Sequence, residues 1–316
     1  MTNYIGRSEG VQNFGRTYRL KFLDKGNNIL HEIYQDDRNQ WNGLRITFEI
    51  DQQTAAMCQG ASFQIYNLSQ KTRTLISSAS KVVFEAGYEL NSGVLYTGNI
   101  VDTLDLRQQP DYIFELICMD YQDQYPPISV DIPSGQTPLQ IVEAVAAKVN
   151  GLGYNVANLK SLPTTPYNKR IHITQMEYTQ AIGKIALLLN ISLWVTNDQI
   201  YALPNKLDGL PANSEKIDIN YKTGMIGSPT YNLANSGVTV LTTLNHRLIP
   251  ANVVKIESQN PQVQVAQAKF IGFDQAALSR GEWVIMTAQH KGDSRDGAWQ
   301  SYIQSFSYEP LGRNLT

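Results

Sequence analysis

The chain has few of the residues that build metal sites, disulfide frameworks or membrane spans. It contains 2 cysteines and 4 histidines. Neither Cys58 nor Cys118 belongs to a CxxC pair or has a histidine at metal-ligand spacing, so a disulfide framework and a zinc site are not expected. No run approaches ~20 apolar residues, and the first fifteen residues lack the apolar core of a signal peptide. The sequence therefore predicts a soluble protein without stable membrane insertion.

An excess of charge of one sign is also missing. Lys and Arg number 26 against 28 Asp and Glu, which gives a formal net charge of -2. Nucleic-acid-binding proteins show a basic surface, and this balance gives no sign of one. A neutral or mildly acidic channel past which DNA slides stays compatible with it. With 42% hydrophobic residues over 316 positions, the chain can form the cores of two or three domains.

Catalytic motifs are missing as well. No GxSxG, Walker loop or GxGxxG occurs, and no histidine has a partner at HxH or HxxxH spacing. The histidines are His31, His172, His246 and His290. Glycoside hydrolysis needs two carboxylates that face one sugar, whereas carboxylates in turns are typical of caps and solvated charges. The pairs that occur in sequence are Asp36–Asp37, Asp102–Asp105 and Asp293–Asp296.

The sharpest catalytic candidate is His290 with Asp293. The two could act as a base and the carboxylate that orients it. In the structural alternative, Asp293 caps a turn after Gly292 and His290 ends a strand. We favour the structural alternative and assign no catalytic residue, no cofactor or cofactor-binding residue, and no metal ligand.

The sequence does contain many short segments in which apolar and polar residues alternate, the pattern of half-buried strands. The first part has a predicted hairpin and five further strands, at 16–23, 29–34, 44–51, 61–69, 81–88, 93–100 and 112–120. Turn residues between strands at this spacing are typical of an antiparallel sandwich or barrel. Residues 112–119 are apolar on both faces. They fit a central strand between two layers, or a barrel wall that also meets another subunit.

A different architecture begins after Pro126-Pro127, because paired prolines disfavour continued helix or sheet. Thr137 and Gln140 predict a capping box at the start of a first helix. Thr174 and Glu177 predict a second box, followed by an apolar helical stripe through residue 189. A hairpin over 191–203 completes a small α+β domain.

The third part is β-rich again, after a linker at 205–214 that is rich in Pro, Gly and Asn. The family resemblance described below places strands of this part at residues 236–241, 253–257, 283–286 and 299–303. The chain therefore divides into five segments. They are an N-terminal arm (1–16), a first β domain (17–125), an α+β middle domain (126–206), a second β domain (207–310) and a C-terminal tail (311–316).

Several motifs, in order, are shared with one protein family. In the first part they are Ile-Tyr-Asn-Leu-Ser (65–69), Lys-Thr-Arg (71–73), Ala-Gly-Tyr (86–88) and Tyr-Thr-Gly-Asn-Ile (96–100). In the third part they are Thr-Gly-Met-Ile-Gly (223–227) with Pro229, and His-Lys-Gly-Asp (290–293) followed by Trp299. From about Tyr18 to Phe306 the chain resembles the baseplate hub proteins of contractile-tailed bacteriophages.

This resemblance implies a mainly β fold with an α+β insert, in which two tube-type antiparallel β-barrel domains flank a small α+β domain. It implies a structural, non-enzymatic protein of the virion tail baseplate, assembled in the host cytoplasm. The expected assembly is a homotrimer whose pseudo-sixfold ring joins the hexameric tail tube to the trimeric central spike. Expected partners are the tail tube or tube-initiator protein, the spike, the tape measure protein and baseplate wedge proteins. DNA would pass through the lumen without sequence-specific binding.

Two other functions are kept open. Residues 133–139 resemble the start of a LysM peptidoglycan-binding module, although Gln136 stands where that module has Asp. A tail-associated peptidoglycan-binding or peptidoglycan-degrading protein is therefore the alternative. A receptor-binding tail protein is a third possibility, but no sequence repeat of the kind found in fibrous proteins is visible.

Overall fold

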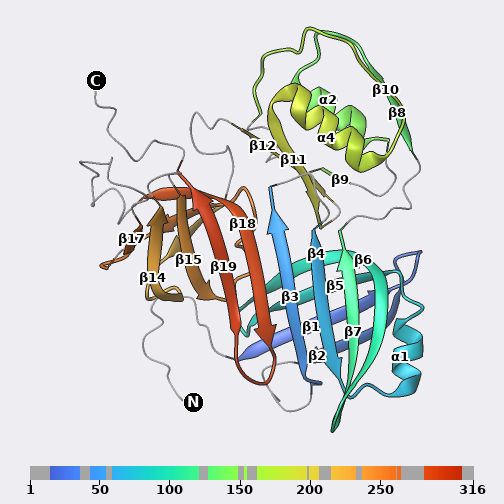
Figure 1. Cartoon of the computed structure of the whole chain (residues 1–316), viewed down its shortest axis with the longest axis vertical. Coiled ribbons are helices and arrows are strands. Elements are labelled where there is room, and N and C mark those ends of the chain that lie inside the picture. The colour runs from blue at the N-terminus through green and yellow to red at the C-terminus, as the bar shows by residue number, and fades with distance from the viewer. Residues whose placement is uncertain are drawn as a thin grey trace, which may run out of the picture.

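The computed structural model describes residues 15–35, 43–54, 59–120, 127–148, 153–154, 162–197, 199–205, 215–232, 237–260, 262–264 and 281–307. Within these ranges the chain is mainly β, in sheets that are largely antiparallel. Figure 1 shows two β-rich parts beside each other and a part with helices at the opposite end of the long axis. No described helix is long and apolar enough to cross a membrane. The predicted N-terminal arm, except its last two residues, and the C-terminal tail lie outside the described residues.

The N-terminal β part forms because strand after strand alternates as the sequence predicts. Its elements are β1 (Arg16–Leu23), β2 (Ile29–Gln35), β3 (Ile46–Gln53), β4 (Gly60–Tyr66), α1 (Gln70–Ile76), β5 (Lys81–Tyr88), β6 (Asn91–Gln108) and β7 (Asp111–Met119). In Figure 1, β1, β2 and β5 cross behind β3, β4 and β7, so the strands wrap around one core. Aromatic rings fill it: the Phe84 ring centroid lies 4.7 Å from that of Phe48 and 5.0 Å from that of Phe63. Burial of each such ring contributes about 2 kcal/mol or more.

The middle part packs two helices against short strands. Its elements are β8 (Ile128–Ile132), α2 (Pro138–Ala146), β9 (Gly153–Tyr154), β10 (Ile171–Met176), α4 (Tyr178–Leu189), β11 (Ile191–Thr196) and β12 (Gln199–Pro204). The predicted capping box of the first helix is confirmed: Thr137 accepts from the Gln140 backbone, and the Gln140 side chain accepts from the Thr137 backbone. The predicted β11–β12 hairpin is also confirmed.

The box predicted for the second helix is wrong. The helix begins at Tyr178 with Glu177 as its N-cap, and no side chain caps it. Thr174 lies in β10, and its hydroxyl bonds to His172 Nε2 at 2.9 Å. The residues on both sides of Thr174 pair with β8, Ile173 with Val130 and Met176 with Ile128, so the chain stays in the strand up to Met176.

The C-terminal β part has its own core of buried aliphatic and aromatic side chains, including Tyr231 and Trp283. Its elements are β13 (Lys216–Ile219), β14 (Met225–Asn232), β15 (Gly237–Thr243), β16 (Val253–Ile256), β17 (Gln262–Gln264), β18 (Glu282–Asp293) and β19 (Trp299–Phe306). The strands expected in this part correspond to β15, β16, β18 and β19. β16 ends one residue before the expected 257, whereas β15, β18 and β19 extend two, seven and three residues past the expected ends at 241, 286 and 303.

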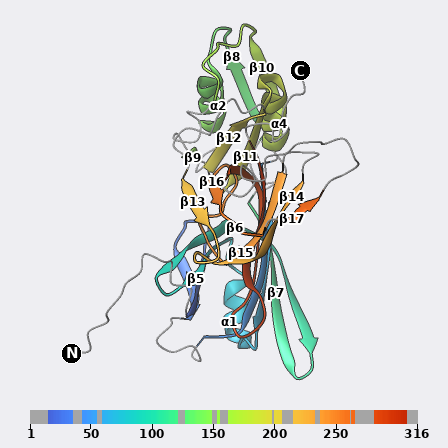
Figure 2. The same ribbon diagram turned by 90° about the vertical axis from the view of Figure 1, so that its left-hand side faces the viewer.

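Both β parts belong to one 14-stranded sheet. Its order is β17-β14-β15-β19-β18-β3-β4-β7-β6-β5-β1-β2, with β16 and β13 paired beside β18. The path of paired strands ends at β17 and β2, so the described strands do not close into a barrel. Figure 2 shows the β6–β7 hairpin projecting from the body of the molecule. The chain is thus mainly β, as expected. Within one chain, the described strands do not form two separate closed barrels.

Candidate functional site: the junction of the two β parts

The two β parts are joined by direct strand pairing between β3 and β18. Seven antiparallel residue pairs connect them, from Thr287–Gln53 to Asp293–Thr47. We call this pairing, together with the turn between β18 and β19, the junction. Residues more than two hundred positions apart in sequence here become neighbours in one sheet. The junction therefore fixes how the two β parts lie relative to each other.

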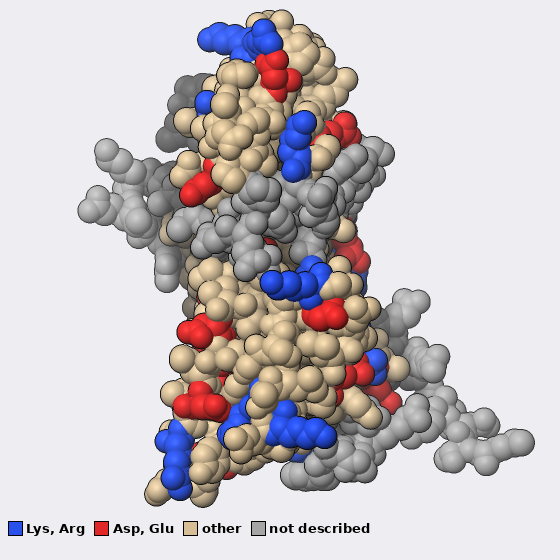
Figure 3. All heavy atoms as spheres, turned by 90° about the vertical axis from the view of Figure 1, so that its right-hand side faces the viewer, with Lys and Arg blue, Asp and Glu red and all other residues tan. Residues whose placement is uncertain are grey.

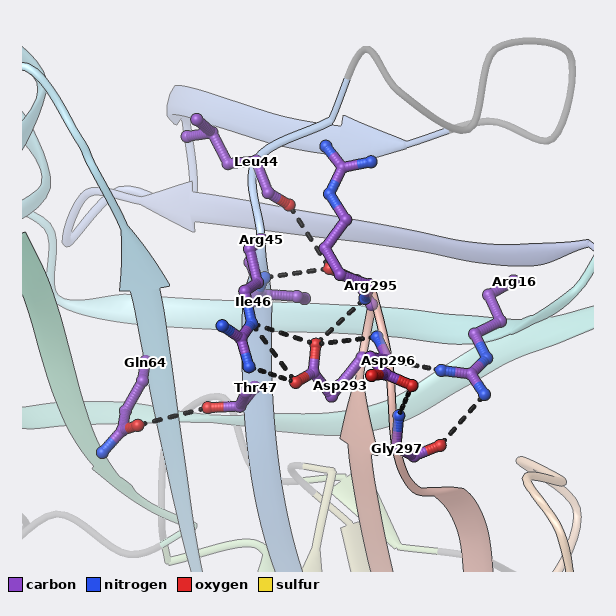
Figure 4. Close-up of polar contacts among 11 residues, drawn as sticks. Arg16, Leu44, Arg45, Ile46, Thr47, Gln64, Asp293, Arg295, Asp296 and Gly297 are labelled. Carbon is purple, nitrogen blue, oxygen red and sulfur yellow. Dashed lines mark hydrogen bonds and ion pairs between the residues drawn. The ribbon is translucent and has the colours of Figure 1, made fainter. Parts of the chain in front are cut away.

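The turn after β18 is held by arginines from the N-terminal β part (Figure 4). Arg45 donates to both carboxylate oxygens of Asp293, with Nη2 at 2.7 Å from Oδ2. Arg16 donates to the backbone carbonyls of Asp293 and Gly297, at 2.8 and 3.0 Å. Arg295 reaches back from the turn to the Gly43 carbonyl. Guanidinium groups suit this role because their planar forks bind carboxylates and carbonyls with fixed geometry.

Asp293 organises the turn from inside. Its Oδ1 accepts from the backbone N–H groups of Arg295 at 2.9 Å and Asp296 at 3.4 Å. Burial acts to raise the pKa of the Asp293 carboxyl, but the hydrogen bonds from Arg45 and from these backbone groups outweigh it and lower that pKa. The carboxylate is therefore held ionised, and it serves as a cap and an ion-pair partner.

Aromatic packing completes the junction. Trp299 belongs to the core of the N-terminal β part, although β19 lies in the C-terminal β part. Its Nε1 donates to the Gly87 carbonyl at 3.0 Å, and its ring meets Phe48 edge to face at 5.2 Å. Gly292 lies against both rings, and a Cβ there would come within 2.4 Å of Phe48 and 2.6 Å of Trp299. A glycine is needed at this position because two aromatic rings occupy the space of a side chain.

His290 lies inside β18 and not at its end, which corrects the expected position. It is fully buried, and its Nδ1 lies 2.8 Å from Ser301 Oγ on β19. Burial and the nearby His246 lower the pKa of His290 to about 4, against an opposing contribution from the Leu248 backbone. His290 is therefore a neutral core residue at neutral pH.

The structure does not bring His290 and Asp293 together as a catalytic pair. The hydrogen bonds of His290 run to β19, whereas those of Asp293 run to Arg45 and the turn. Asp102 accepts from the Thr103 backbone, and Asp105 forms an ion pair with Arg73 at 3.4 Å. The pair Asp36–Asp37 lies outside the described residues. Among the residues that the structure describes, no group of three His, Cys, Asp or Glu could hold a metal ion.

The arginines of the junction were missed by the sequence reasoning. Arg16 and Arg45 each stand at or next to the start of an alternating segment, where charged residues are ordinary. The pattern shows which face of a strand is buried and gives no signal for a partner over two hundred residues away. Only the Gly-Asp turn followed by Trp299, taken from the family resemblance, pointed to this place.

Charged side chains of both signs are mixed on the face shown in Figure 3, over the atoms that the structure describes. This mixture agrees with the balanced composition of 26 Lys and Arg against 28 Asp and Glu.

The fold is shared with solved structures of tail proteins. The tail protein from Neisseria meningitidis MC58 gives a TM-score of 0.55 at 11% identity, over 94% of this chain and 99% of that one. The 43 kDa tail protein of prophage MuSo2 from Shewanella oneidensis gives 0.53 at 10% identity, over 94% and 100%. The E. coli c3393 protein gives 0.50 at 13% identity, over 86% and 76%. That protein is a component of the type VI secretion system with structural similarity to the T4 bacteriophage tail proteins gp27 and gp5.

At these identities the likeness shows a common fold. No curated protein sequence matches the chain. The chain thus has the fold of these tail proteins. The sequence matches the family described as baseplate hub gp41 over residues 32–267, and the chain belongs to that family. The resemblance to baseplate hub proteins is therefore confirmed.

Proposed function

We propose that the chain is the structural hub subunit of a tail baseplate, and that three copies close into a pseudo-sixfold ring. Each copy contributes two tube-type modules, the N-terminal and C-terminal β parts. The ring joins the hexameric tail tube to the trimeric central spike and surrounds the channel for tape measure and DNA. Its place is the baseplate of a virion assembled in the host cytoplasm.

The observation that carries this proposal is the β3–β18 pairing. A sixfold tube can meet a threefold spike through three chains only if each chain presents two similar units side by side. The junction holds two β-rich units next to each other in one sheet. The continuous sheet supplies the arc of wall that each copy would add to the ring.

The open ends of the sheet are where neighbouring copies meet in this proposal. β2 ends the sheet on one side, and it exposes Ile29 (58%) and Tyr34 (54%). An unpaired edge strand with exposed apolar side chains is a template for pairing with another chain. Head-to-tail contact from β2 to the β14–β17 end of the next copy generates a closed ring when the rotation per copy is a third of a turn.

The apolar outer face of β7 has a role in the same assembly. Phe114 and Leu116 point into the core, while Met119 on the opposite face is 38% exposed. Of the two explanations for a strand that is apolar on both faces, we propose the barrel wall that also meets another subunit.

The middle part faces outward in this proposal, toward baseplate wedge proteins. It is docked firmly to both β parts. Trp194 and Leu203 pack with Val253 and Val284 of the C-terminal β part. Asn197, at the turn of the β11–β12 hairpin, accepts from the Thr97 backbone of β6 at 2.7 Å. The five-segment division of the chain remains our proposal, and the separate cores of the three parts support it.

We further propose that the protein is not an enzyme. The engagement of Asp293 by Arg45 and the burial of His290 support this. A turbidity assay on purified cell walls tests it, and clearing that Asp293→Ala abolishes would establish the peptidoglycan-degrading alternative.

Light scattering coupled to size exclusion tests the ring. We expect a species of three times the chain mass of 35.4 kDa, seen by cryo-EM as a ring with six similar lobes. A double variant of the β2 edge, Ile29→Lys with Tyr34→Gln, should shift the protein to monomers that unfold normally. Leu187→Lys is the matched control, because Leu187 is 83% exposed on α4, away from the proposed contact.

A wild-type protein that stays monomeric at high concentration, with no such ring in the virion, would overturn the proposal. A ring that survives the β2 double variant would leave the hub function standing and place the subunit contact elsewhere.

A further inference from the structure

Two histidines lie at or beside the junction and take no part in holding the turn: His290 is fully buried, and His246 is half-buried. His290 comes from β18, whose neighbour β3 belongs to the N-terminal β part, and it lies opposite Ile50. His246 follows β15, and its ring lies on the backbone of β6, where a Cβ on Gly93 would come within 2.4 Å of it. The two rings therefore stand where elements of both β parts meet.

The hydrogen bonds around His290 suit its neutral form. Ser301 Oγ accepts from the Asn245 backbone at 3.1 Å, so its own proton is free to be donated to His290 Nδ1, 2.8 Å away. A proton arriving at that nitrogen requires Ser301 Oγ to turn its own proton away and accept a second bond, and it places a charge in a site without exposed surface. The His246 ring fills the space that a side chain on Gly93 would need.

Few charged groups can compensate such a proton. Arg247, next to His246, lowers the pKa of His246 together with burial, while Glu215 acts in the opposite direction. Glu215 already binds Arg247, whose Nε lies 2.7 Å from Oε1. On β3 and β18, the charged neighbours Glu49, Asp51 and Lys291 lie on the other face of the sheet because side chains alternate. Once both histidines are charged, each also repels the other.

We propose that the buried His290, together with the neighbouring His246, makes the junction acid-labile, so that mild acid opens the β3–β18 pairing and frees the two β parts from each other. The proposal concerns the single chain and does not require the ring. An acid response of the junction and a failure to form trimers are therefore separate results.

The direction in which pH changes the stability of the junction follows from proton binding to the folded and open states. The folded-state pKa of His290 is about 4, against an ordinary value of 6.5, so the open state binds protons more tightly. Stability from this site is complete above pH 6.5 and falls as the pH drops from 6.5 toward 4. Between pH 7.5 and pH 5, His290 alone should raise the opening equilibrium about 30-fold. The pKa of Asp293 is lowered from 3.8, so its ion pair with Arg45 persists at pH 5.

Hydrogen exchange with mass spectrometry on the full chain, corrected for intrinsic rates, tests the proposal. In the wild type, backbone amides of β3 and β18 should exchange about 30-fold faster through opening at pH 5 than at pH 7.5. The amides of β8 and β10 in the middle part serve as the internal reference. His290→Gln keeps an acceptor for Ser301 without a titratable charge, and should reduce the acid response to less than 3-fold. His172→Gln, an exposed histidine in the middle part, should leave it unchanged.

If His290→Gln does not fold, His246→Gln decides the matter, because it removes the second charge while keeping His290, and the response should fall by several-fold. A wild-type junction that exchanges no faster at pH 5, or variants at both histidines that keep the full response, would overturn the proposal.

Discussion

Gly292 lies where two aromatic side chains from different ends of the sequence meet. A methyl group there would overlap Phe48 and Trp299, both of which are held by the core. Gly292→Ala should therefore lower the free energy of unfolding by about 1–3 kcal/mol, as overpacking of a filled core does. Urea denaturation followed by tryptophan fluorescence measures it.

Gly183→Ala is the matched control with the opposite sign. Gly183 lies within α4, and a Cβ there would meet nothing within 4 Å. Alanine in a helix interior should stabilise by about 0.5–1 kcal/mol. Equal changes in the free energy of unfolding for the two substitutions would show that overlap with Phe48 and Trp299 does not determine the effect of Gly292→Ala.

Arg45 is the second residue on which the junction depends. Besides its two bonds to Asp293, its guanidinium lies 4.6 Å from the centre of the Tyr66 ring. Arg45→Ala should lower the free energy of unfolding by about 1–2 kcal/mol, since the side chain is partly exposed. Arg45→Lys should recover part of this, because an ammonium keeps the charge and loses the fork.

Lys255→Ala provides the comparison for an ordinary surface ion pair. Lys255 lies 3.1 Å from Glu257, with both side chains more than 40% exposed. Its loss should leave the free energy of unfolding unchanged within the error of the measurement. An Arg45 variant that is no more destabilised than this one would contradict the role given to the junction arginines.

At the scale of elements, the two helices of the middle part differ in how they begin. The first has a complete capping box at Thr137 and Gln140, whereas Glu177 caps the second without a side-chain bond to the backbone. Thr137→Ala should cost about 1 kcal/mol, while Glu177→Ser should gain about 0.5 kcal/mol because serine can accept from the first turn. Thermal unfolding of the two variants measures both. A destabilising effect of Glu177→Ser would mean that the backbone N–H groups in the first turn of α4 already have hydrogen-bond partners.

These helix starts also show what the sequence could and could not predict. The residues of α2 were sufficient to predict this helix, because the capping residues and the apolar stripe indicate the same start. The same local reasoning failed at Thr174, which lies in β10 at the irregularity between Ile173 and Met176, the residues on either side that pair with β8. The α1 helix (Gln70–Ile76) was not predicted. Only Ile76 of its seven residues is buried, so the segment lacks the apolar stripe that indicates a helix.

The strands were predictable for the same local reason, but their partners were not. Alternation located β3 within a few residues, whereas only residues 283–286 were expected for β18, which continues to Asp293. The alternation of apolar and polar residues carries no information about the partner strand, so it could not predict that Gln289 lies opposite Asp51. The predicted end of β6 at Ile100 was eight residues short, because residues 101–108 are mostly exposed on both faces and lack the pattern.

At the scale of the whole molecule, the two β parts are not independent units joined by a linker. Leu244 and Trp299 of the C-terminal β part are buried in the core of the N-terminal β part. The N-terminal β part therefore lacks some of its core without the C-terminal β part. Strand patterning and the family resemblance suggested two tube-type β-barrel domains, and neither indicates that both parts belong to one sheet.

A covalent link across the junction tests whether the two β parts of one chain are the ones that pair. Asp51 and Gln289 lie directly opposite in β3 and β18, with Gln289 Nε2 at 2.9 Å from Asp51 Oδ1. Opposite Cβ atoms in antiparallel strands are about 4.5–5.5 Å apart, a reach that disulfides tolerate with small shifts. With Cys58 replaced by serine, Asp51→Cys combined with Gln289→Cys should therefore form a bridge after mild oxidation.

The bridge should lie within one chain. On a non-reducing denaturing gel the oxidised double variant should run as a compact single chain, and Gln289→Cys alone should run as the unlinked protein. The cross-linked protein should still form the trimer, because the junction is already closed in the proposed ring. Dimers and trimers that survive denaturation would mean that β3 of one copy pairs with β18 of the next, and the two modules of the pseudo-sixfold ring would then come from different chains.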